Sequence, residues 1–243
     1  MLTDCPFCGL PFVEANLALS SFGLMHLSEK LKWKSQCSCL TEEKEREIWE
    51  RLEERRRANR QAAVKVRYRE SRMPPRFLRR TFESYLPADQ RQQEALERCA
   101  EYAGNFLRWK NEENHSLLLS GPSDRGKSHL AQAIANTLLA VGCSLIYENW
   151  VHLLSRFRRA FRDREGEAEK QPLLDCDCLV LDDLGVGGGE TWVVTTLYEI
   201  IDHRLEWDRP TVITTNLAVA ELGELYGGRV ASRLGRGYRV VRV

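Results

Sequence analysis

The sequence has no long hydrophobic run, and this absence excludes one class of protein. No stretch of its 243 residues is apolar enough and long enough to cross a bilayer. The N-terminus begins Met-Leu-Thr-Asp-Cys and lacks the basic and then apolar layout of a secretory signal peptide. Internal repeats and low-complexity tracts are also absent. With an ordinary hydrophobic content of 43%, the composition predicts a globular protein of the cytoplasm.

The chain has little net charge, +1, but the charge is unevenly distributed. Residues 55–72 contain eight basic side chains and a single acidic one, Glu70. A local cluster of this kind favours an anionic partner, such as nucleic acid or an acidic protein surface. A solvated helix face explains the same cluster equally well.

Disulfides are not expected among the eight cysteines, because the cytoplasm is reducing. Four of them form two close pairs near the N-terminus, Cys5 with Cys8 and Cys37 with Cys39. Thiolates at these spacings predict a tetrahedral zinc site, although C-x-C is a less usual closing pair and His26 is an alternative ligand. A segment of about forty residues needs such a staple to hold a fold, so we expect structural Zn²⁺ here.

The double proline in Met73-Pro74-Pro75 divides the sequence, because it ends any helix that reaches it. We predict a zinc-binding N-terminal region over residues 1–40, a charged helical linker over 41–75 and an α/β domain over 76–243. The linker pairs glutamate with arginine at i,i+4 but has few apolar residues. It is therefore expected to act as a connector or docking surface rather than as part of a core.

Beyond the prolines, short apolar runs alternate with segments of helical period. The runs are 116–120, 143–147, 179–182, 211–215 and 238–243, and the helical segments lie near 89–109, 127–141, 149–161, 190–207 and 218–234. Strands that alternate with helices predict a parallel sheet covered by helices on both faces.

Residues 121–128 read Gly-Pro-Ser-Asp-Arg-Gly-Lys-Ser and match the phosphate-binding pattern G-x-x-x-x-G-K-S. The segment follows an apolar strand and opens a helix, which is the context that the motif requires. Backbone N–H groups and the helix N-terminus would surround the phosphates of ATP, with Lys127 on the β- and γ-phosphates and Ser128 on Mg²⁺. The predicted nucleotide-binding residues are Gly121, Pro122, Ser123, Asp124, Arg125, Gly126, Lys127, Ser128 and His129.

A strand that ends in two acids supplies the other half of the site. In the sequence 178–183, Cys-Leu-Val-Leu-Asp-Asp, we expect Asp182 to bind Mg²⁺ and Asp183 to lie beside the attacking water. Asn216, which follows the next predicted strand, is a candidate to orient that water, or a turn residue kept for local reasons. Together the two halves are typical of a P-loop ATPase of the AAA+ type.

Two positions depart from the usual AAA+ pattern. Asp124 stands where most such loops have glycine, and aspartate tolerates a left-handed backbone better than most residues do. Asp183 stands where many AAA+ enzymes have glutamate. Because aspartate is one methylene shorter, we predict slow hydrolysis, which suits a switch rather than a motor.

From Arg76 onward, the order of motifs resembles the bacterial replicative helicase loaders of the DnaC/DnaI type, with transposition helper ATPases of the IstB type as close cousins. The segments that carry this resemblance are 121–136, 179–185, 197–204, 210–217 and 228–234. The resemblance implies an AAA+ fold with a five-stranded parallel sheet in the order 5-1-4-3-2. It also implies a spiral or ring-like oligomer with ATP between subunits.

The resemblance implies a role for one further segment. In related initiator ATPases, an arginine in a stretch similar to residues 230–234 touches the γ-phosphate of the neighbouring subunit, which assigns this role to Arg233, with Arg229 second. An arginine supplied in trans makes hydrolysis depend on assembly. Two surface ion pairs are the plainer explanation. Since the sequence stops at Val243, no helical lid is expected after the last strand.

Residues 150–164 interleave basic side chains with Phe157 and Phe161. Such a pattern suits single-stranded DNA, through phosphate charge and base stacking, but the aromatic residues also have the spacing of a helix face that packs in a core. The candidate DNA contacts are Arg156, Arg158, Arg159 and Arg162.

These features predict a slow ATPase that loads a replicative helicase hexamer onto single-stranded DNA. Its expected cofactors are ATP, Mg²⁺ and structural Zn²⁺, its residues 1–72 dock the helicase, and it self-associates through the ATP site. The alternative is a transposition helper that acts on duplex DNA and a transposase, against which the cysteine pairs and the long linker argue. A third hypothesis is a nucleotide-binding adaptor with negligible hydrolysis.

Overall fold

The computed structural model describes residues 42–109, 115–163, 165–187 and 190–243. It divides the chain into two units, Met1–Gln61 and Ala62–Val243. The predicted zinc ligands Cys5, Cys8, Cys37 and Cys39 lie outside the described residues. No helix in the described ranges has the length and apolar character that a bilayer crossing needs.

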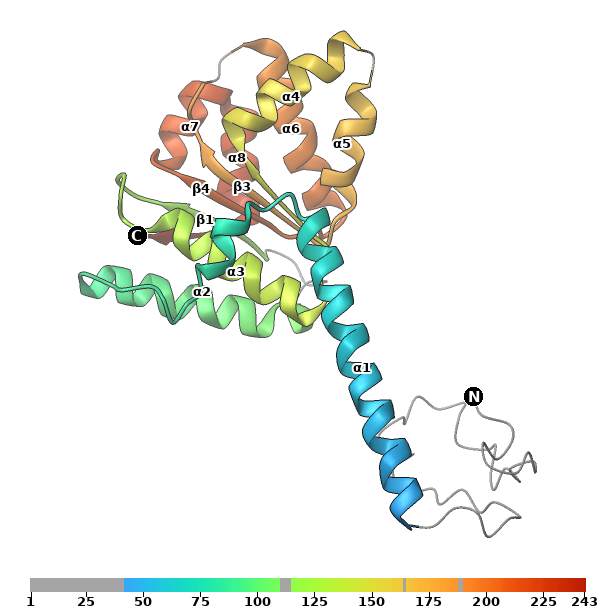
Figure 1. The fold of residues 1–243 in the computed structure, drawn as a ribbon. Coiled ribbons are helices and arrows are strands. Elements are labelled where there is room, and N and C mark those ends of the chain that lie inside the picture. Colours follow the sequence, from blue (N-terminus) through green and yellow to red (C-terminus); the bar gives the residue numbers. More distant parts are fainter. Residues whose placement is uncertain (1–41, 110–114, 164, 188–189) are drawn as a thin grey trace. The chain divides into compact units, whose positions relative to one another are not determined.

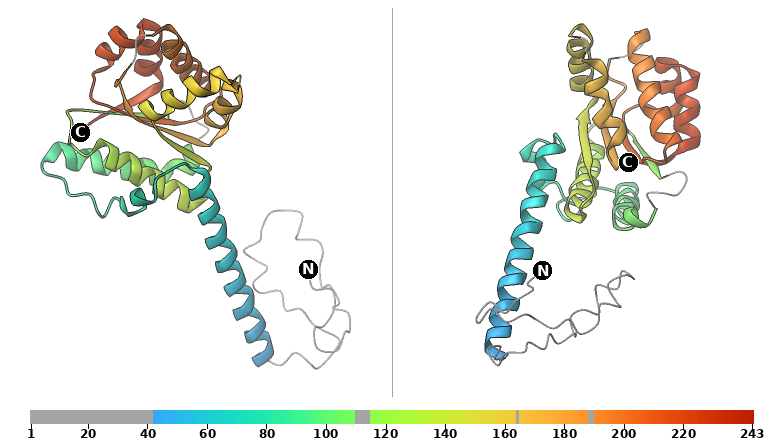
Figure 2. Two further views of the ribbon diagram at one scale, coloured as in Figure 1. Left: turned by 45° about the horizontal axis from the view of Figure 1, so that its top comes forward. Right: turned by 90° about the vertical axis from the view of Figure 1, so that its right-hand side faces the viewer.

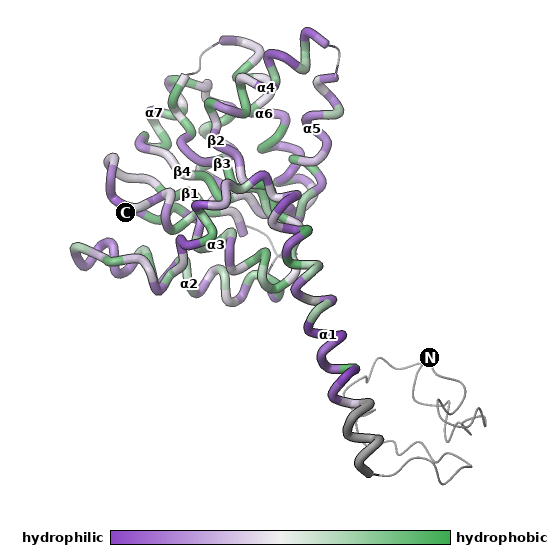
Figure 3. Tube along the Cα trace, in the orientation of Figure 1, coloured by the Kyte–Doolittle hydropathy of each residue, from purple (hydrophilic) through white to green (hydrophobic). Residues whose placement is uncertain are grey.

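The charged segment before the prolines forms one helix, α1 (Glu42–Glu70). Most of its described side chains are exposed, and Figure 3 shows that hydrophilic residues predominate along it. Its last turns belong to the second unit, where Tyr68 donates a hydrogen bond to Asn136 Oδ1 over 3.2 Å. The predicted charged helix is therefore present, and its C-terminal end is fixed to the α/β domain.

Five parallel strands form the predicted sheet, in the order β2-β3-β4-β1-β5. This is the order 5-1-4-3-2 read from the other edge, so the expected topology is confirmed. The strands are β1 (Ser116–Ser120), β2 (Leu145–Asn149), β3 (Cys178–Leu184), β4 (Thr211–Thr215) and β5 (Tyr238–Arg242). Their C-terminal ends lie along one edge of the sheet, because all the pairings are parallel.

Helices cover both faces of the sheet, as Figures 1 and 2 show. On one face, α2 (Gln90–Trp109) and α3 (Lys127–Val141) enclose a core that includes Leu117 and Leu119. Between these two leucines, Leu118 points to the opposite core, since side chains alternate along a strand. The helices of that second core are α4 (Trp150–Arg162), α5 (Gly166–Asp175), α6 (Thr191–Glu206), α7 (Val219–Tyr226) and α8 (Gly228–Gly237).

The elements differ from the sequence prediction in three main ways. The second strand begins at Leu145 rather than residue 143, because Gly142 and Cys143 close α3 through hydrogen bonds to Leu139 and Leu138. The predicted helix 218–234 is two helices, broken at Gly227, whose φ of +89° favours glycine. The short helix α5 was not predicted, since Pro172 lies inside it.

A buried arginine joins several elements at the N-terminal ends of the strands. Arg204, on α6, has 0% of its surface exposed. Its guanidinium donates hydrogen bonds of 2.7–3.2 Å to one hydroxyl and four backbone carbonyls, those of Thr211, Leu173, Leu174, Cys176 and Pro210. The Pro210 carbonyl also accepts from the Leu179 N–H, but Arg204 links all four carbonyls and so fixes the connections that enter β3 and β4.

The segment after α1 is attached to the edge strand β2. Tyr147 donates its backbone N–H to the Ser71 carbonyl over 2.9 Å. Next to it, the nearly buried Glu148 forms ion pairs with Arg72 at 3.0 Å and with Arg156. The same two arginines pair with Glu169 at 2.8 Å. This network ties the end of the linker to β2, α4 and α5.

Candidate nucleotide-binding site

The phosphate-binding sequence forms the loop between β1 and α3. A side chain at Gly121 would place its Cβ 2.3 Å from the Val243 carbonyl oxygen, so glycine is required there. Gly126 has φ +85°, and a Cβ on it would meet the Tyr85 ring at 2.5 Å. Asp124 has φ +60° and an exposed side chain, so this aspartate does take the left-handed conformation.

Lys127 begins α3 and is 5% exposed. Its Nζ donates one hydrogen bond, 2.6 Å to the Pro122 carbonyl, within the described part of the chain. An ammonium group has three donors, so this cation keeps donor capacity for a ligand. Burial lowers the pKa of Lys127, while the charges of Asp183, Asp182 and Asp124 raise it. A loop of constrained glycines around an incompletely paired cation fits a phosphate group.

A β-bulge shapes the end of β3. Leu181 pairs with Ile213 and Leu184 with Thr215, so β3 has one extra residue between these pairs. Asp183 lies in the bulge with φ +60°, a conformation that costs energy for a residue other than glycine. The bulge leaves Asp182 buried and Asp183 half-buried, and the charges of both act on Lys127.

Two hydroxyl groups hold Asp182. Thr214, on β4, donates to Asp182 Oδ1 over 2.6 Å, and Tyr147, on β2, donates to Asp182 Oδ2. Gln132, on α3, in turn donates to the Tyr147 hydroxyl over 3.0 Å. Burial, followed by the charge of Asp182, raises the pKa of Tyr147, so the phenol stays a donor. Three neighbouring strands therefore orient a carboxylate of the type that binds Mg²⁺.

Asp183 has a different environment. Asn149, at the end of β2, donates from Nδ2 to Asp183 Oδ2 over 3.0 Å. The Asp183 N–H donates to Thr214 Oγ1 over 2.9 Å. Burial and then the Asp182 charge raise the pKa of Asp183, against the effects of Lys127 and Asn149. A carboxylate with a raised pKa is a better proton acceptor, which is what a general base needs.

The remaining loop residues divide into two groups. Pro122, Ser123 and Ser128 lie at the surface of the loop and the first turn of α3, with Ser128 half-buried beside Lys127. Arg125 forms an ion pair with Asp89, and His129 contacts the Thr81 carbonyl over 3.0 Å. The structure thus places Arg125 and His129 in contact with the segment that precedes α2.

That segment and the first turn of α2 contact the loop from outside. The Tyr85 hydroxyl donates to the Arg125 carbonyl over 3.0 Å, and Gln92 Nε2 donates to the same carbonyl over 3.1 Å. The Ser84 hydroxyl lies 3.1 Å from His129 Nε2. These contacts support the loop at the Arg125 carbonyl and at His129.

Asn216 lies just beyond β4 and is exposed. No hydrogen bond to its side chain is found among the described residues. The β4 residue that the structure brings to both acids is Thr214. Sequence reasoning missed Thr214, Tyr147 and Asn149, and the available signal was their position at the C-terminal ends of strands that neighbour β3.

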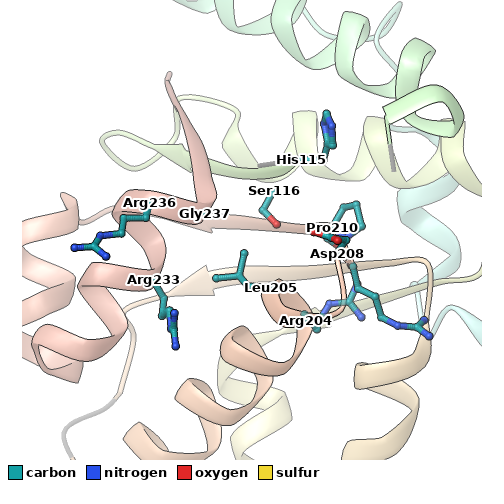
Figure 4. Close-up of a pocket in the computed structure, with 10 residues that line it drawn as sticks. His115, Ser116, Arg204, Leu205, Asp208, Pro210, Arg233, Arg236 and Gly237 are labelled. Carbon is teal, nitrogen blue, oxygen red and sulfur yellow. Dashed lines mark hydrogen bonds between the residues drawn. The ribbon is translucent and has the colours of Figure 1, made fainter. Parts of the chain in front are cut away.

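Arg229 and Arg233 lie on α8, away from the phosphate-binding loop. Arg233 borders a cavity of about 270 Å³ together with His115, Ser116 and Pro210, which lie at the N-terminal ends of β1 and β4 (Figure 4). The loop lies at the opposite ends of these strands. Arg229 is exposed, whereas Arg233 Nε forms an ion pair with Asp202 Oδ1 at 2.6 Å.

The four candidate DNA contacts on α4 differ in their partners. Arg156 belongs to the ion-pair network with Glu148 and Glu169, described above. Arg158 pairs with Glu190 at 2.7 Å, and Arg162 donates to the Arg158 carbonyl over 3.2 Å. Arg159 is exposed, without a side-chain partner in the described ranges.

The two aromatic residues of this helix also differ. Phe157 is fully buried in the second core, while Phe161 is 45% exposed and stacks against it. The expected core position is therefore occupied by Phe157, and Phe161 is available at the surface beside the arginines.

Comparisons with known proteins place this geometry in a family. A family model of IstB-like ATP-binding proteins matches residues 18–233. The replicative helicase loader DnaC of Escherichia coli is 31% identical over 184 residues, covering 74% of this chain and 73% of that protein.

Solved structures have the same fold. A crystal structure of the DnaC helicase loader matches with a TM-score of 0.63 and 23% identity, over 70% of this chain and 99% of that one. AMPPCP-bound DnaA from Aquifex aeolicus matches with a TM-score of 0.61 and 19% identity, over 71% of this chain. The match spans 51%, about half, of the DnaA chain.

Proposed function

The chain belongs to the family of IstB-like ATP-binding proteins, and on this basis we propose that it is an ATP-controlled loader of a replicative helicase onto single-stranded DNA. The observation that carries the proposal is the similarity to the helicase loader DnaC, which extends over about three quarters of both proteins. Loading takes place in the cytoplasm, and the ATP site acts as its switch.

The site supports binding of ATP through the loop 121–128 and through the ammonium group of Lys127, which donates one hydrogen bond among the described residues. Ser128 and Asp182 are the residues that would hold Mg²⁺, which when bound would neutralise charge on the phosphates. Asp183 accepts the proton of the attacking water, since its pKa is raised and its side chain is only half-buried. Asn216, beyond β4, helps to orient this water.

Slow hydrolysis follows from the way Asp183 is held. Its carboxylate is one methylene shorter than a glutamate, and Asn149 pairs with one of its oxygens at 3.0 Å. This hydrogen bond must be exchanged before that oxygen can contact a water molecule. A slow reaction of this kind times an event and does not drive continuous movement.

The second part of the switch is self-association. Arg233, with Arg229 on the same helix, contacts the γ-phosphate bound by a neighbouring subunit. The location of Arg233 on α8, at the other end of the sheet from its own loop, supports a role in trans. An arginine in such a position contributes roughly a 10³-fold or larger acceleration in related phosphoryl transfer reactions.

Two further regions recognise the partners. Residues 1–72 dock the helicase hexamer, and zinc bound by Cys5, Cys8, Cys37 and Cys39 holds their fold. Single-stranded DNA contacts the arginines of α4. Arg159 and Arg162 are the strongest candidates there, because Arg156 and Arg158 are already paired with carboxylates, at 2.5–2.9 Å.

A transposition helper is the second candidate function, and the IstB-like family match favours it. Such a protein would bind duplex DNA and a transposase instead of a helicase. The two functions therefore differ in partner rather than in ATP chemistry.

Co-purification with the replicative helicase of the host tests the proposal. We expect a complex with the wild-type chain, and loss of that complex with Cys5→Ser/Cys8→Ser, together with loss of bound zinc. Lys127→Ala is the control, since it changes the ATP site but should keep the docking region intact. Failure to capture the helicase with or without ATP, combined with binding of duplex DNA and a transposase, would favour the second function.

A further inference from the structure

One side of α6 faces the side chain of Arg233. Asp202 forms the ion pair with Arg233 Nε at 2.6 Å, and Tyr198 and Glu206 lie one turn before and one turn after it on the same face of α6. The Tyr198 hydroxyl, then the charges of Asp202 and Glu206, raise the pKa of Arg233. Arg233 is 45% exposed and Asp202 20%, so the pair lies at the rim of the subunit.

Arg233 differs from the other arginines of its helix. Arg229 and Arg236 are exposed, and in the described part of the chain neither side chain forms a hydrogen bond or an ion pair. Figure 4 shows Arg233 turned toward the helix that carries Arg204 and Leu205, while Arg236 extends in another direction. The arginine proposed to act in trans is thus the one that is held within its own subunit.

The backbone around this ion pair is fixed. Two residues after Asp202, the fully buried Arg204 anchors α6 through its hydrogen bonds to backbone carbonyls. On α8, Val230 and Leu234 flank Arg233 and are buried in the second core. Opening the ion pair between Arg233 and Asp202 therefore requires rotation of the Arg233 side chain and not movement of a helix.

While Arg233 is paired with Asp202 through Nε, its side chain is directed against α6 of its own subunit. Asp202 Oδ1 is shielded from solvent, and Arg233 is its ion-pair partner in the described residues, so opening the pair leaves a carboxylate without compensation. An anion with more charge than one carboxylate, such as the terminal phosphate of ATP, can outcompete it.

We propose that Asp202 is a positioning residue that holds Arg233 against α6 in the separate subunit and releases it only to the γ-phosphate of an adjoining subunit. This inference rests on the proposed role of Arg233 in trans. The ion pair keeps hydrolysis low until two subunits are correctly assembled, and it makes the arginine selective for bound ATP over ADP.

A mixing experiment separates this role from the general role of Arg233. One chain, the acceptor, carries Arg233→Ala, so it binds ATP but supplies no arginine. The other, the donor, carries Lys127→Ala, so it supplies Arg233 but has an impaired ATP site. ATP turnover of the mixture with single-stranded DNA then reports how well the donor offers Arg233.

We expect Asp202→Asn in the donor to raise the turnover of the mixture about 3- to 5-fold, the size associated with removal of a partly exposed ion pair. Asp202→Glu in the donor keeps a carboxylate at this position, so the turnover of the mixture should equal that with the unmodified donor. Glu199→Gln is the matched control, because this acid also lies on α6 but pairs with Lys170 at 2.9 Å. It should leave the turnover unchanged.

Each other result has a distinct meaning. Equal or lower turnover with the folded Asp202→Asn donor would overturn the inference, and so would an Asp202→Glu donor that is as active as Asp202→Asn. If the unmodified donor adds nothing to the acceptor alone, the role of Arg233 in trans is wrong and the inference falls with it. Melting temperatures of all donors show which chains are folded. If Asp202→Asn is unfolded, the Asp202→Glu donor decides instead. A mixture whose ATP turnover with this donor differs from that with the unmodified donor would overturn the proposal.

Discussion

Each end of the sheet buries a cation, and the two cations are held in opposite ways. Lys127, at the C-terminal ends of the strands, is 5% exposed and donates one hydrogen bond of its own, to Pro122. Arg204, at the N-terminal ends, is 0% exposed and its nitrogens donate to five oxygen acceptors at 2.7–3.2 Å. Both side chains lose their hydration, but among the described residues Arg204 regains far more hydrogen bonds than Lys127 does.

The difference separates a binding group from a structural group. A buried cation with all its donors paired stabilises the elements around it, and nothing remains for a ligand. A buried cation with free donors costs stability, which is recovered when an anion binds. Burial alone therefore does not identify a cation that binds a ligand. The number of its N–H donors that lack an acceptor does.

The largest effect is expected from Arg204→Ala. This change removes the donors that Arg204 supplies to the carbonyls of Leu173, Leu174, Cys176 and Pro210, and we expect a loss of about 3–5 kcal/mol in the free energy of unfolding. Chemical denaturation measures it. Arg236→Ala, at an exposed arginine without partners in the described residues, should change stability by less than about 0.5 kcal/mol. A loss below about 1 kcal/mol for Arg204→Ala would contradict the structural role.

Lys127→Ala should have the opposite pattern, with a large effect on ATP turnover and little loss of stability. We expect ATP turnover to fall by about 100-fold or more, because a preorganised donor to the phosphates is lost. The melting temperature should stay the same or rise, since a buried and poorly paired charge is removed. Turnover and thermal unfolding of the same preparation provide both numbers. A large fall in melting temperature would make Lys127 a structural residue like Arg204.

Tyr147→Phe tests whether a hydroxyl group orients Asp182 in the ATP site. It removes the hydroxyl that donates to Asp182, so the carboxylate is less well oriented and the Mg²⁺ concentration for half-maximal turnover should rise about 10-fold. A titration of turnover against Mg²⁺ measures this. Tyr102→Phe is the control, because the Tyr102 hydroxyl donates to the His115 carbonyl over 2.8 Å, away from the acids. The same Mg²⁺ requirement in both variants would rule out the proposed function of Tyr147.

The smallest effect concerns the charge on Asp183. Its pKa is raised in the folded protein, so the folded state binds this proton more tightly than the unfolded chain does. Stability is therefore lost as the pH rises from the usual pKa of an aspartate through the raised value. Asp183→Asn should raise the melting temperature at neutral pH, and the gain should shrink as the pH falls through this window. A pH series of melting temperatures that shows a gain independent of pH would contradict this account.

Much of the fold and the centre of the site could be predicted from the sequence. The loop 121–128 and the acids Asp182 and Asp183 lie in short contiguous motifs, so local order was enough to find them. The alternation of apolar runs with helical segments predicted the parallel sheet for the same reason. The break at Gly227 was missed, because apolar residues with helical period continue across it into α8.

The residues that orient the acids could not be found in this way. Tyr147, Asn149 and Thr214 reach Asp182 and Asp183 only because β2, β3 and β4 are neighbours in the sheet. Their separation from the acids in sequence is about thirty residues, and no local pattern marks them. Arg204 appeared only as part of a family-like segment, since its role depends on carbonyls from the two connections that enter β3 and β4.

Loading onto a closed circle of single-stranded DNA is the most direct test of whether this chain is a helicase loader, because a ring-shaped helicase cannot thread onto a DNA that has no end. The host helicase, the circle, ATP and this chain are incubated together, and the helicase that remains on the circle is counted after a wash in high salt. We expect stable helicase on the circle with the wild-type chain, and little with Lys127→Ala or without the chain. Equal amounts of helicase on the circle with and without the chain would contradict it.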